Sequence, residues 1–261
     1  MTKRVRHRNQ ITFQRLRRLF SLSLFFLTQP GMAQSDTQFW YETMVNCPFA
    51  NVYNLESAFT YATTVNNKPK WANLDLQETL ERSLSQHFDL MGAFLFSNTI
   101  QNDSLSTREL RPTLGFKIHF TPNSRILTRL LVRFENRNFL NTETDTWSGS
   151  NRSRVRFESI IPFNKPTMFA GDKLWYGIFD AELFIVQDQQ LHERFANRFR
   201  LRAALGYRLS YDWRFELMYT LQESQNEIGT AFTTLDNIYR VRVKFYLNKS
   251  KPAKGVTGPG N

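Results

Sequence analysis

Apolar and polar residues alternate along residues 198–209 (RFRLRAALGYRL), and this alternation constrains the fold more than any other feature of the chain. Successive side chains of a β-strand point to opposite sides, so one face of this segment is apolar and the other carries arginines. The pattern returns in residues 213–222 and 239–247, and with more interruptions in most segments after residue 38. No segment there shows the 3.6-residue period of a helix. The sequence therefore predicts an all-β fold.

Eleven segments alternate in this way, and the connections between them differ in length. The short connections are residues 84–87, 121–125 and 210–212, and the long polar ones are residues 101–107, 141–150, 187–196 and 224–236. Short turns at one rim and long loops at the other are typical of bacterial transmembrane barrels, which have an even number of strands. We therefore expect an antiparallel up-and-down β-barrel of about 10–12 strands, and the even number favours ten or twelve. Residues 164–174 are too long for a short turn and predict a periplasmic excursion.

The length of the segments and their aromatic ends favour a membrane as the surroundings of this barrel. Segments of about ten to thirteen residues are long enough to cross a bilayer when tilted. Tryptophan and tyrosine lie at the segment ends, where aromatic belts form, as at Trp71, Trp175 and Tyr239. Glu78 interrupts the apolar face of residues 74–80. A soluble periplasmic barrel or sandwich, with its apolar side turned inward, shows the same alternation and stays open as an alternative.

The first 33 residues have the layout of a secretory signal peptide. Seven basic residues and no acidic residue precede the apolar run LFSLSLFFL at residues 19–27, which is too short to cross a bilayer as a helix. Gly31 and Ala33 then lie three and one positions before a cleavage point at Gln34. We therefore expect residues 1–33 to be a cleaved signal peptide and the protein to be exported to the outer membrane of a Gram-negative cell. A basic, nucleic-acid-binding amino terminus is the alternative interpretation.

Removal of a signal peptide changes the charge balance of the chain. The full sequence has 34 Lys and Arg against 23 Asp and Glu, and without the seven basic residues of the signal it has 27 against 23, a net charge of +4. The pI of about 9.9 thus reflects the signal, and we expect no nucleic-acid partner.

The single cysteine, Cys47, has no partner for an internal disulfide. Residues 249–261 are basic and lack an apolar pattern, which predicts a disordered tail after a barrel over residues 36–248.

Three stretches of the sequence carry a resemblance to a known family. They are the opening QFWYET, the hairpin LSYDWRFELMYTLQ and the closing DNIYRVRVKFYLN. Together with the series of ten-residue alternating strands, they resemble the uncharacterised outer-membrane barrel family known as domain of unknown function 2490, of Bacteroidetes-type bacteria, over roughly residues 36–248. The resemblance implies a transmembrane β-barrel and no particular activity. Outer-membrane lipid and the barrel-insertion machinery are then the expected partners.

The polar face of the predicted strands is rich in arginine. The basic residues that we expect to point into the lumen are Arg129, Arg133, Arg152, Arg154, Arg156, Arg198, Arg200, Arg202, Arg240 and Arg242. The acidic residues that we expect as their partners on the same face are Glu135, Glu158, Asp180, Glu182 and Glu216. Cross-strand pairs of opposite charge would fill a narrow barrel. Unpaired arginines would instead make an electropositive channel or a site for an anionic ligand.

These two states of the lumen predict two different functions. Because acidic partners are plentiful on the same face, we expect a narrow or side-chain-filled lumen, which predicts a scaffold or a protein that binds through its surface loops. An open lumen is the alternative, and it predicts an anion-preferring channel or transporter for a small anionic solute. A membrane-embedded hydrolase is a remote third interpretation, because His87, His119 and His192 show no spacing to a serine and an acid that suits catalysis. Since no metal-ligand cluster or phosphate-binding glycine loop is recognisable, we expect no enzyme activity, no cofactor and no metal.

Overall fold

The computed structural model describes five stretches of the chain, which are residues 37–65, 71–100, 106–187, 196–225 and 234–247. They belong to one compact unit that begins at Asp36. The predicted signal peptide (residues 1–33), the predicted tail (residues 249–261) and His192 lie outside the described residues. No helix in the described part of the chain is long and apolar enough to cross a membrane.

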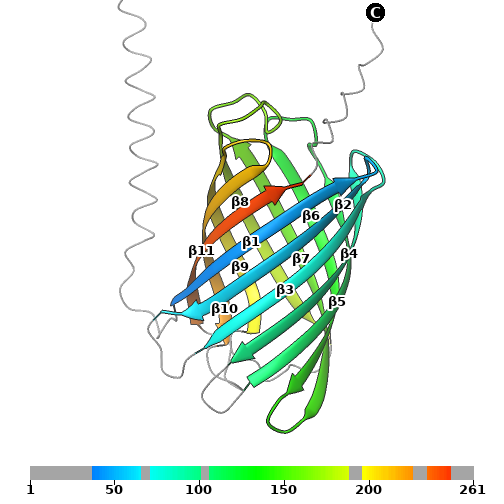
Figure 1. Ribbon diagram of the computed structural model, residues 1–261, viewed down its shortest axis with the longest axis vertical. Helices are drawn as coiled ribbons and strands as arrows, with labels where there is room; N and C mark the ends of the chain where they lie inside the picture. Colours follow the sequence, from blue (N-terminus) through cyan, green and yellow to red (C-terminus); the bar gives the residue numbers. More distant parts are fainter. Residues whose placement is uncertain (1–36, 66–70, 101–105, 188–195, 226–233, 248–261) are drawn as a thin grey trace, which may run out of the picture. The chain divides into compact units, whose positions relative to one another are not determined.

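In these stretches, eleven strands form one closed barrel (Figure 1). The strands are β1 (Thr37–Phe49), β2 (Tyr53–Thr64), β3 (Ala72–Ser83), β4 (Phe88–Ile100), β5 (Ser106–His119), β6 (Leu127–Asn141), β7 (Thr146–Pro162), β8 (Leu174–Val186), β9 (Ala196–Arg208), β10 (Trp213–Gln225) and β11 (Thr234–Tyr246). Each strand pairs antiparallel with the next strand in the sequence, and β1 pairs with β11. The prediction of an all-β barrel is therefore confirmed.

The strand count determines how the barrel closes. Eleven lies within the predicted range of 10–12, but the expectation of an even number is wrong. Each hairpin reverses the direction of the chain, so with an odd number the first and last strands run the same way. The pair β1–β11 is accordingly parallel, and its register runs from Thr37↔Asn237 to Asn46↔Tyr246. Closure leaves no unpaired sheet edge among the described strands, so their backbone groups bond within the barrel.

The two rims of the barrel differ in their connections. Residues 50–52, 84–87, 120–126, 163–173 and 209–212 join strands at one end, which we call the short-turn rim, and the other end is the long-loop rim. The predicted long loop of residues 141–150 is wrong, because β6 and β7 continue to Asn141 and Thr146. Asp145, with φ of 52°, supplies the left-handed residue of the tight turn between them. This hairpin extends furthest of the described strands at the long-loop rim (Figure 1).

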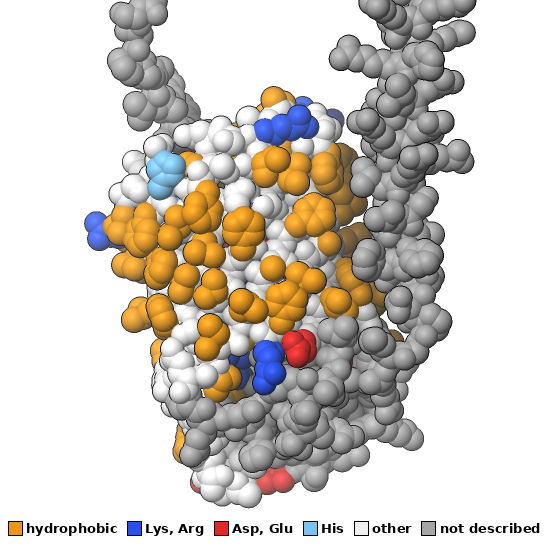
Figure 2. Space-filling view, turned by 180° about the vertical axis from the view of Figure 1, so that it is seen from behind, with side chains coloured by type: hydrophobic (Ala, Val, Ile, Leu, Met, Phe, Trp, Pro, Cys, Tyr) orange, Lys and Arg blue, Asp and Glu red, His pale blue; other side chains and the backbone are white. Residues whose placement is uncertain are grey.

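The barrel is apolar outside and charged inside. Leu114 is 70% exposed and Leu217 is 61% exposed on the outer face, whereas Glu182 is fully buried. Figure 2 shows apolar side chains across the middle of the outer face. This arrangement is the opposite of the one that the soluble alternative requires. Glu78 lies on the apolar outer face, where its carboxylate accepts a hydrogen bond from the Ser57 hydroxyl of β2 at 2.6 Å.

Candidate functional site

A cavity of about 500 Å³ lies inside the barrel, and all eleven strands contribute to its lining. Its lining reaches from Gln38 and Trp71 near the long-loop rim to Phe169 and Tyr246 near the short-turn rim. The alternation of each strand brings every second side chain to this space, because successive residues face opposite sides of the sheet. The cavity therefore collects the charged face that the sequence predicts for each strand.

The structure places almost all of the predicted basic cluster in the cavity lining. Nine of its ten arginines line the cavity, namely Arg129, Arg133, Arg152, Arg154, Arg156, Arg200, Arg202, Arg240 and Arg242. Arg198 is exposed near the end of β9 and is not among the lining residues. The β9–β10 register shifts there, since Phe199 pairs with Glu223 and Asn197 with Ser224. We call the lumen-facing residues of β6–β11 the arginine wall.

Glu182 on β8 lies at the centre of the ion pairs in this wall. It is fully buried, and its carboxylate lies 2.9 Å from Arg133, 2.8 Å from Arg154 and 3.6 Å from Arg202. Three strands, β6, β7 and β9, thus direct a guanidinium at one carboxylate. Such a buried anion is stable only because the neighbouring cations offset the loss of its hydration.

The other predicted acidic residues also pair with arginines of the cluster. Glu135 pairs with Arg152 and Arg154, Glu158 with Arg129, Asp180 with Arg202, and Glu216 with Arg242 and Lys244. These oxygen–nitrogen distances run from 2.5 to 3.2 Å. The ion pairs hold the arginine side chains against the wall, so the predicted basic and acidic sets are brought together. Arg156 makes no hydrogen bond or ion pair with the described residues, and its Nε is buried without an acceptor.

Sequence reasoning missed two participants on β1. The carboxylate of Glu42 pairs with Arg240 at 3.2 Å and with Arg242. The Trp40 ring lies 4.3 Å from the Arg240 guanidinium and 5.6 Å from that of Arg200. Both contacts depend on the closure of β1 against β11, which joins residues about 200 positions apart. The alternation of β1 is a weak signal for its face, and no local pattern gives its partner strand.

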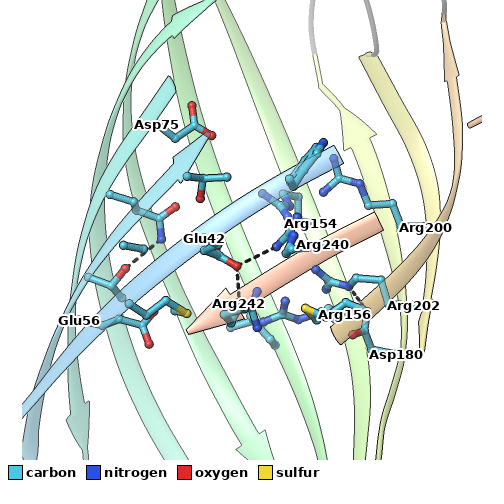
Figure 3. Close-up of a pocket in the computed structure, with 18 of the residues that line it drawn as sticks. Glu42, Glu56, Asp75, Arg154, Arg156, Asp180, Arg200, Arg202, Arg240 and Arg242 are labelled. Carbon is cyan, nitrogen blue, oxygen red and sulfur yellow. Dashed lines mark hydrogen bonds and ion pairs between the residues drawn. The ribbon is translucent and has the colours of Figure 1, made fainter. Parts of the chain in front are cut away.

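The lumen-facing residues of β1–β4, which we call the opposite wall, carry no basic side chain. Arg82 is the one basic residue in these four strands, and it is exposed, with its guanidinium 5.7 Å from the Tyr53 ring. Glu56 and Asp75 line the cavity from β2 and β3, and neither forms an ion pair in the described part of the barrel. Asp75 accepts a hydrogen bond from the Asn73 amide at 2.7 Å. Figure 3 shows Glu56 and Asp75 across the lumen from Arg200 and Arg202.

Residues 163–173, between β7 and β8, cover part of the short-turn rim, and we call them the plug segment. The Asn164 amide donates to the Lys173 carbonyl at 2.8 Å, and its oxygen accepts from the Trp175 backbone N–H at 2.8 Å. These bonds tie the two ends of the segment together. Arg208 of β9 donates to the Met168 carbonyl at 2.9 Å and also to the Gly171 carbonyl. One buried arginine therefore anchors the segment at two points.

The tip of the plug segment enters the mouth of the barrel. Met168 is 8% exposed and packs in an apolar cluster with Leu174, Tyr176 and Ile178. Phe169 contributes to the cavity lining. Residues 164–174 thus lie at the short-turn rim, as expected, and the tip of the segment turns toward the lumen. Met168 is buried there, which is favourable for an apolar side chain, whereas the Phe169 ring is 67% exposed.

The described residues include two histidines, His87 and His119, and one cysteine, Cys47. They contain no group of three or more His, Cys, Asp or Glu that could hold a metal ion. His119 Nε2 lies 2.7 Å from the Asp89 carboxylate, and His87 Nδ1 lies 2.8 Å from the His119 carbonyl. Both contacts lie near the short-turn rim. The arrangement can hold charge and bind ions, and its chemistry is that of electrostatic recognition.

Comparison with known proteins agrees with the barrel architecture. A family model described as "Protein of unknown function (DUF2490)" matches residues 37–233. No curated protein matches the chain. A solved structure titled "NanC porin structure in rhombohedral crystal form" is similar, with a TM-score of 0.51 and 13% identity, over 82% of this chain and 100% of that one. At this identity the likeness shows the fold alone, which is a porin-like β-barrel.

Proposed function

The chain belongs to the DUF2490 family, whose description assigns no function, so we propose one from the barrel itself. We propose that it is an outer-membrane protein whose narrow, arginine-lined lumen admits small anionic solutes. The observation that carries this proposal is the charge difference between the arginine wall and the opposite wall. Charged rings and walls select ions by sign in other pores.

The outer face supports a location in a membrane. Soluble monomers rarely expose contiguous apolar patches larger than a few hundred Å², and this barrel exposes large apolar side chains on every strand. Aromatic rings gather at the short-turn rim, where Trp175 lies 4.6 Å from Tyr207 and Trp213 lies 4.7 Å from Phe245. Such rings form belts at membrane interfaces. Together with the signal peptide that the sequence predicts over residues 1–33, these features favour the outer membrane, with the long-loop rim outward.

Two measurements test the location. The intact mass of protein taken from the cell envelope should lack residues 1–33, and a mass that includes them would contradict export by a cleaved signal. A tag placed within residues 188–195 should be labelled on intact cells, whereas a tag within residues 121–125 should not. A protein that stays soluble after envelope fractionation would reject the membrane proposal.

The charges of the lumen support anion preference. Basic side chains outnumber acidic ones in the cavity lining, and Arg156 lines the cavity without an ion-pair partner among the described residues. An excess of fixed positive charge in a narrow, partly desolvated space attracts anions and repels cations. The cavity of about 500 Å³ fits small solutes rather than polymers.

Anion preference is measured as a reversal potential in a planar bilayer under a KCl gradient. The purified protein should conduct, and the sign of the potential should report chloride as the more permeant ion. Arg156→Gln removes a positive charge that forms no ion pair with the described residues, and should lower the preference without loss of the fold. Arg82→Gln, on the outer face, is the control and should leave the potential unchanged. Absence of current, or a cation preference, would reject the proposal.

A side-chain-filled barrel that acts through its surface loops is the second candidate function. The density of ion pairs along the arginine wall and the plug segment over the short-turn rim favour it. The two candidates differ in one measurable quantity, because a filled lumen gives no conductance. In that case Arg156→Gln would change neither current nor ion preference.

A further inference from the structure

Two carboxylates of the opposite wall, Glu56 and Asp75, form no ion pair with the described residues and give the lumen a second charged side. Glu56 and Asp75 come from neighbouring strands, β2 and β3, and both line the cavity. Neither has a basic partner in the described part of the barrel, whereas Glu42, Glu135, Glu158 and Glu182 each pair with an arginine. The negative charge of this wall is therefore available to a solute.

Strand order places these carboxylates opposite the arginines. Five steps around the barrel, through β1, β11, β10 and β9, separate β2 from β8, and six steps separate them in the other direction. The arginine wall around β8 includes Arg156 on β7 and Arg202 on β9. Figure 3 shows Arg156 and Arg202 on one side of the lumen and Glu56 and Asp75 on the other. The electric field in the lumen thus runs across the barrel.

A transverse field acts differently on the three kinds of small ion. A simple anion is attracted to the arginine wall but repelled by the opposite wall. A simple cation is attracted to the opposite wall but repelled by the arginine wall. A zwitterion lying across the lumen is attracted at both ends, because its anionic group faces arginine and its cationic group faces carboxylate. The walls also supply hydrogen-bonding groups for such a solute, among them Gln77 and Thr79 on β3.

From this geometry we infer that the lumen favours small zwitterionic solutes over simple anions of the same size. The inference rests on the proposed function, since it assumes that the lumen admits solutes. It narrows the solute class from anions in general to molecules that carry an anionic group and a cationic group at opposite ends.

A matched pair of sulfonates tests the inference. Taurine carries an ammonium group at the position where 1-propanesulfonate carries a methyl group, and both sulfonates stay ionised at neutral pH. Protein in liposomes is exposed to each solute, and the rate of osmotic swelling is recorded, with potassium and valinomycin supplying the counter-ion for propanesulfonate. The wild-type protein should pass taurine faster than propanesulfonate. Glu56→Gln combined with Asp75→Asn should lower the ratio of the two rates about five- to tenfold, since it removes the charges that hold the ammonium group.

Glu78→Gln is the control, because this carboxylate lies on β3 but faces outward, where it accepts a hydrogen bond from Ser57. It should leave the ratio unchanged. Equal rates for the two solutes, or a ratio that the double variant does not alter, would overturn the inference while leaving the anion-admitting lumen intact. If neither solute enters the liposomes, the proposed function fails, and the inference fails with it.

Discussion

The ring of Tyr176 on β8 lies directly over Gly206 on β9. The two residues are register partners, and a Cβ atom at position 206 would stand 2.2 Å from Cζ of the tyrosine ring. The ring crosses β9 at this point, so the Tyr176 hydroxyl reaches β10 and donates to the Glu216 carboxylate at 2.8 Å. The absence of a side chain at Gly206 therefore allows one buried tyrosine to link three strands.

Gly206→Ala is expected to destabilise the barrel. The added methyl group cannot fit beneath the ring, and the displaced tyrosine would lose its bond to Glu216. Overpacking of this kind costs about 1–3 kcal/mol. Urea unfolding of the reconstituted protein measures the change. Gly92→Ala is the matched control, since its nearest neighbour would be a Leu114 methyl at 4.0 Å; equal losses in the two variants would contradict the role of the ring.

Glu182→Gln should destabilise the arginine wall. The substitution keeps the size of the side chain but removes the negative charge that faces Arg133, Arg154 and Arg202. Removing one partner of a buried ion pair costs about 3–5 kcal/mol, because the remaining charges stay buried without compensation. Unfolding in urea, compared with Glu143→Gln in the exposed turn between β6 and β7, tests this. A change as small as that of the control would mean that water in the lumen replaces the carboxylate.

The strand pattern and much of the arginine wall could be predicted from the sequence, because both depend on the alternation of neighbouring residues. Residues 198–209 give the two faces of β9 without reference to any other strand. Nine of ten predicted arginines line the cavity for this reason. Arg198 departs from the prediction where the β9–β10 register shifts, since an irregularity in pairing interrupts the alternation that sequence reasoning assumes.

The features that sequence reasoning missed depend on contacts between distant residues. The pairing of Glu42 with Arg240 requires the parallel closure of β1 on β11, which no local pattern gives. The count of eleven alternating segments matches the eleven strands, and the expectation of an even number came from the general rule for bacterial barrels. The length of the plug segment can be counted in the sequence. Its position over the lumen depends on hydrogen bonds from Arg208, which lies on another strand, and the spacing of residues in the sequence does not predict those bonds. Local periodicity thus predicts which face a residue lies on but not which residue it meets.

Leu217→Arg should hinder insertion of the barrel. Leu217 is 61% exposed on the outer face of β10, in register with Leu205 and Val241. A lipid-facing arginine near the bilayer midplane costs about 2–4 kcal/mol. Gln77→Arg, which places the same side chain in the cavity, is the control and should be tolerated better. The measurement is the folded fraction after refolding into lipid vesicles, and equal yields for the two variants would contradict a lipid-facing outer surface.

Arg208→Ala should open the short-turn rim if the plug segment limits passage through the lumen. Arg208 is 7% exposed, and its two bonds to the carbonyls of Met168 and Gly171 hold the segment over the mouth. Without them the segment keeps its ties at Asn164 but loses the anchor at its tip, so the apolar contacts of Met168 alone oppose its movement. Single-channel conductance in a planar bilayer should therefore rise.

Arg208→Ala also removes a positive charge from this rim, and that loss itself affects anion conductance. Lys165→Ala is the control that separates the effect of the lost charge from the effect of a wider opening. Lys165 lies in the same segment, so its removal changes the charge at the rim by the same amount. Lys165→Ala should lower or leave unchanged the anion current, whereas Arg208→Ala should raise it, because a wider opening outweighs one lost charge. If both variants give the same current, the plug segment does not restrict the lumen.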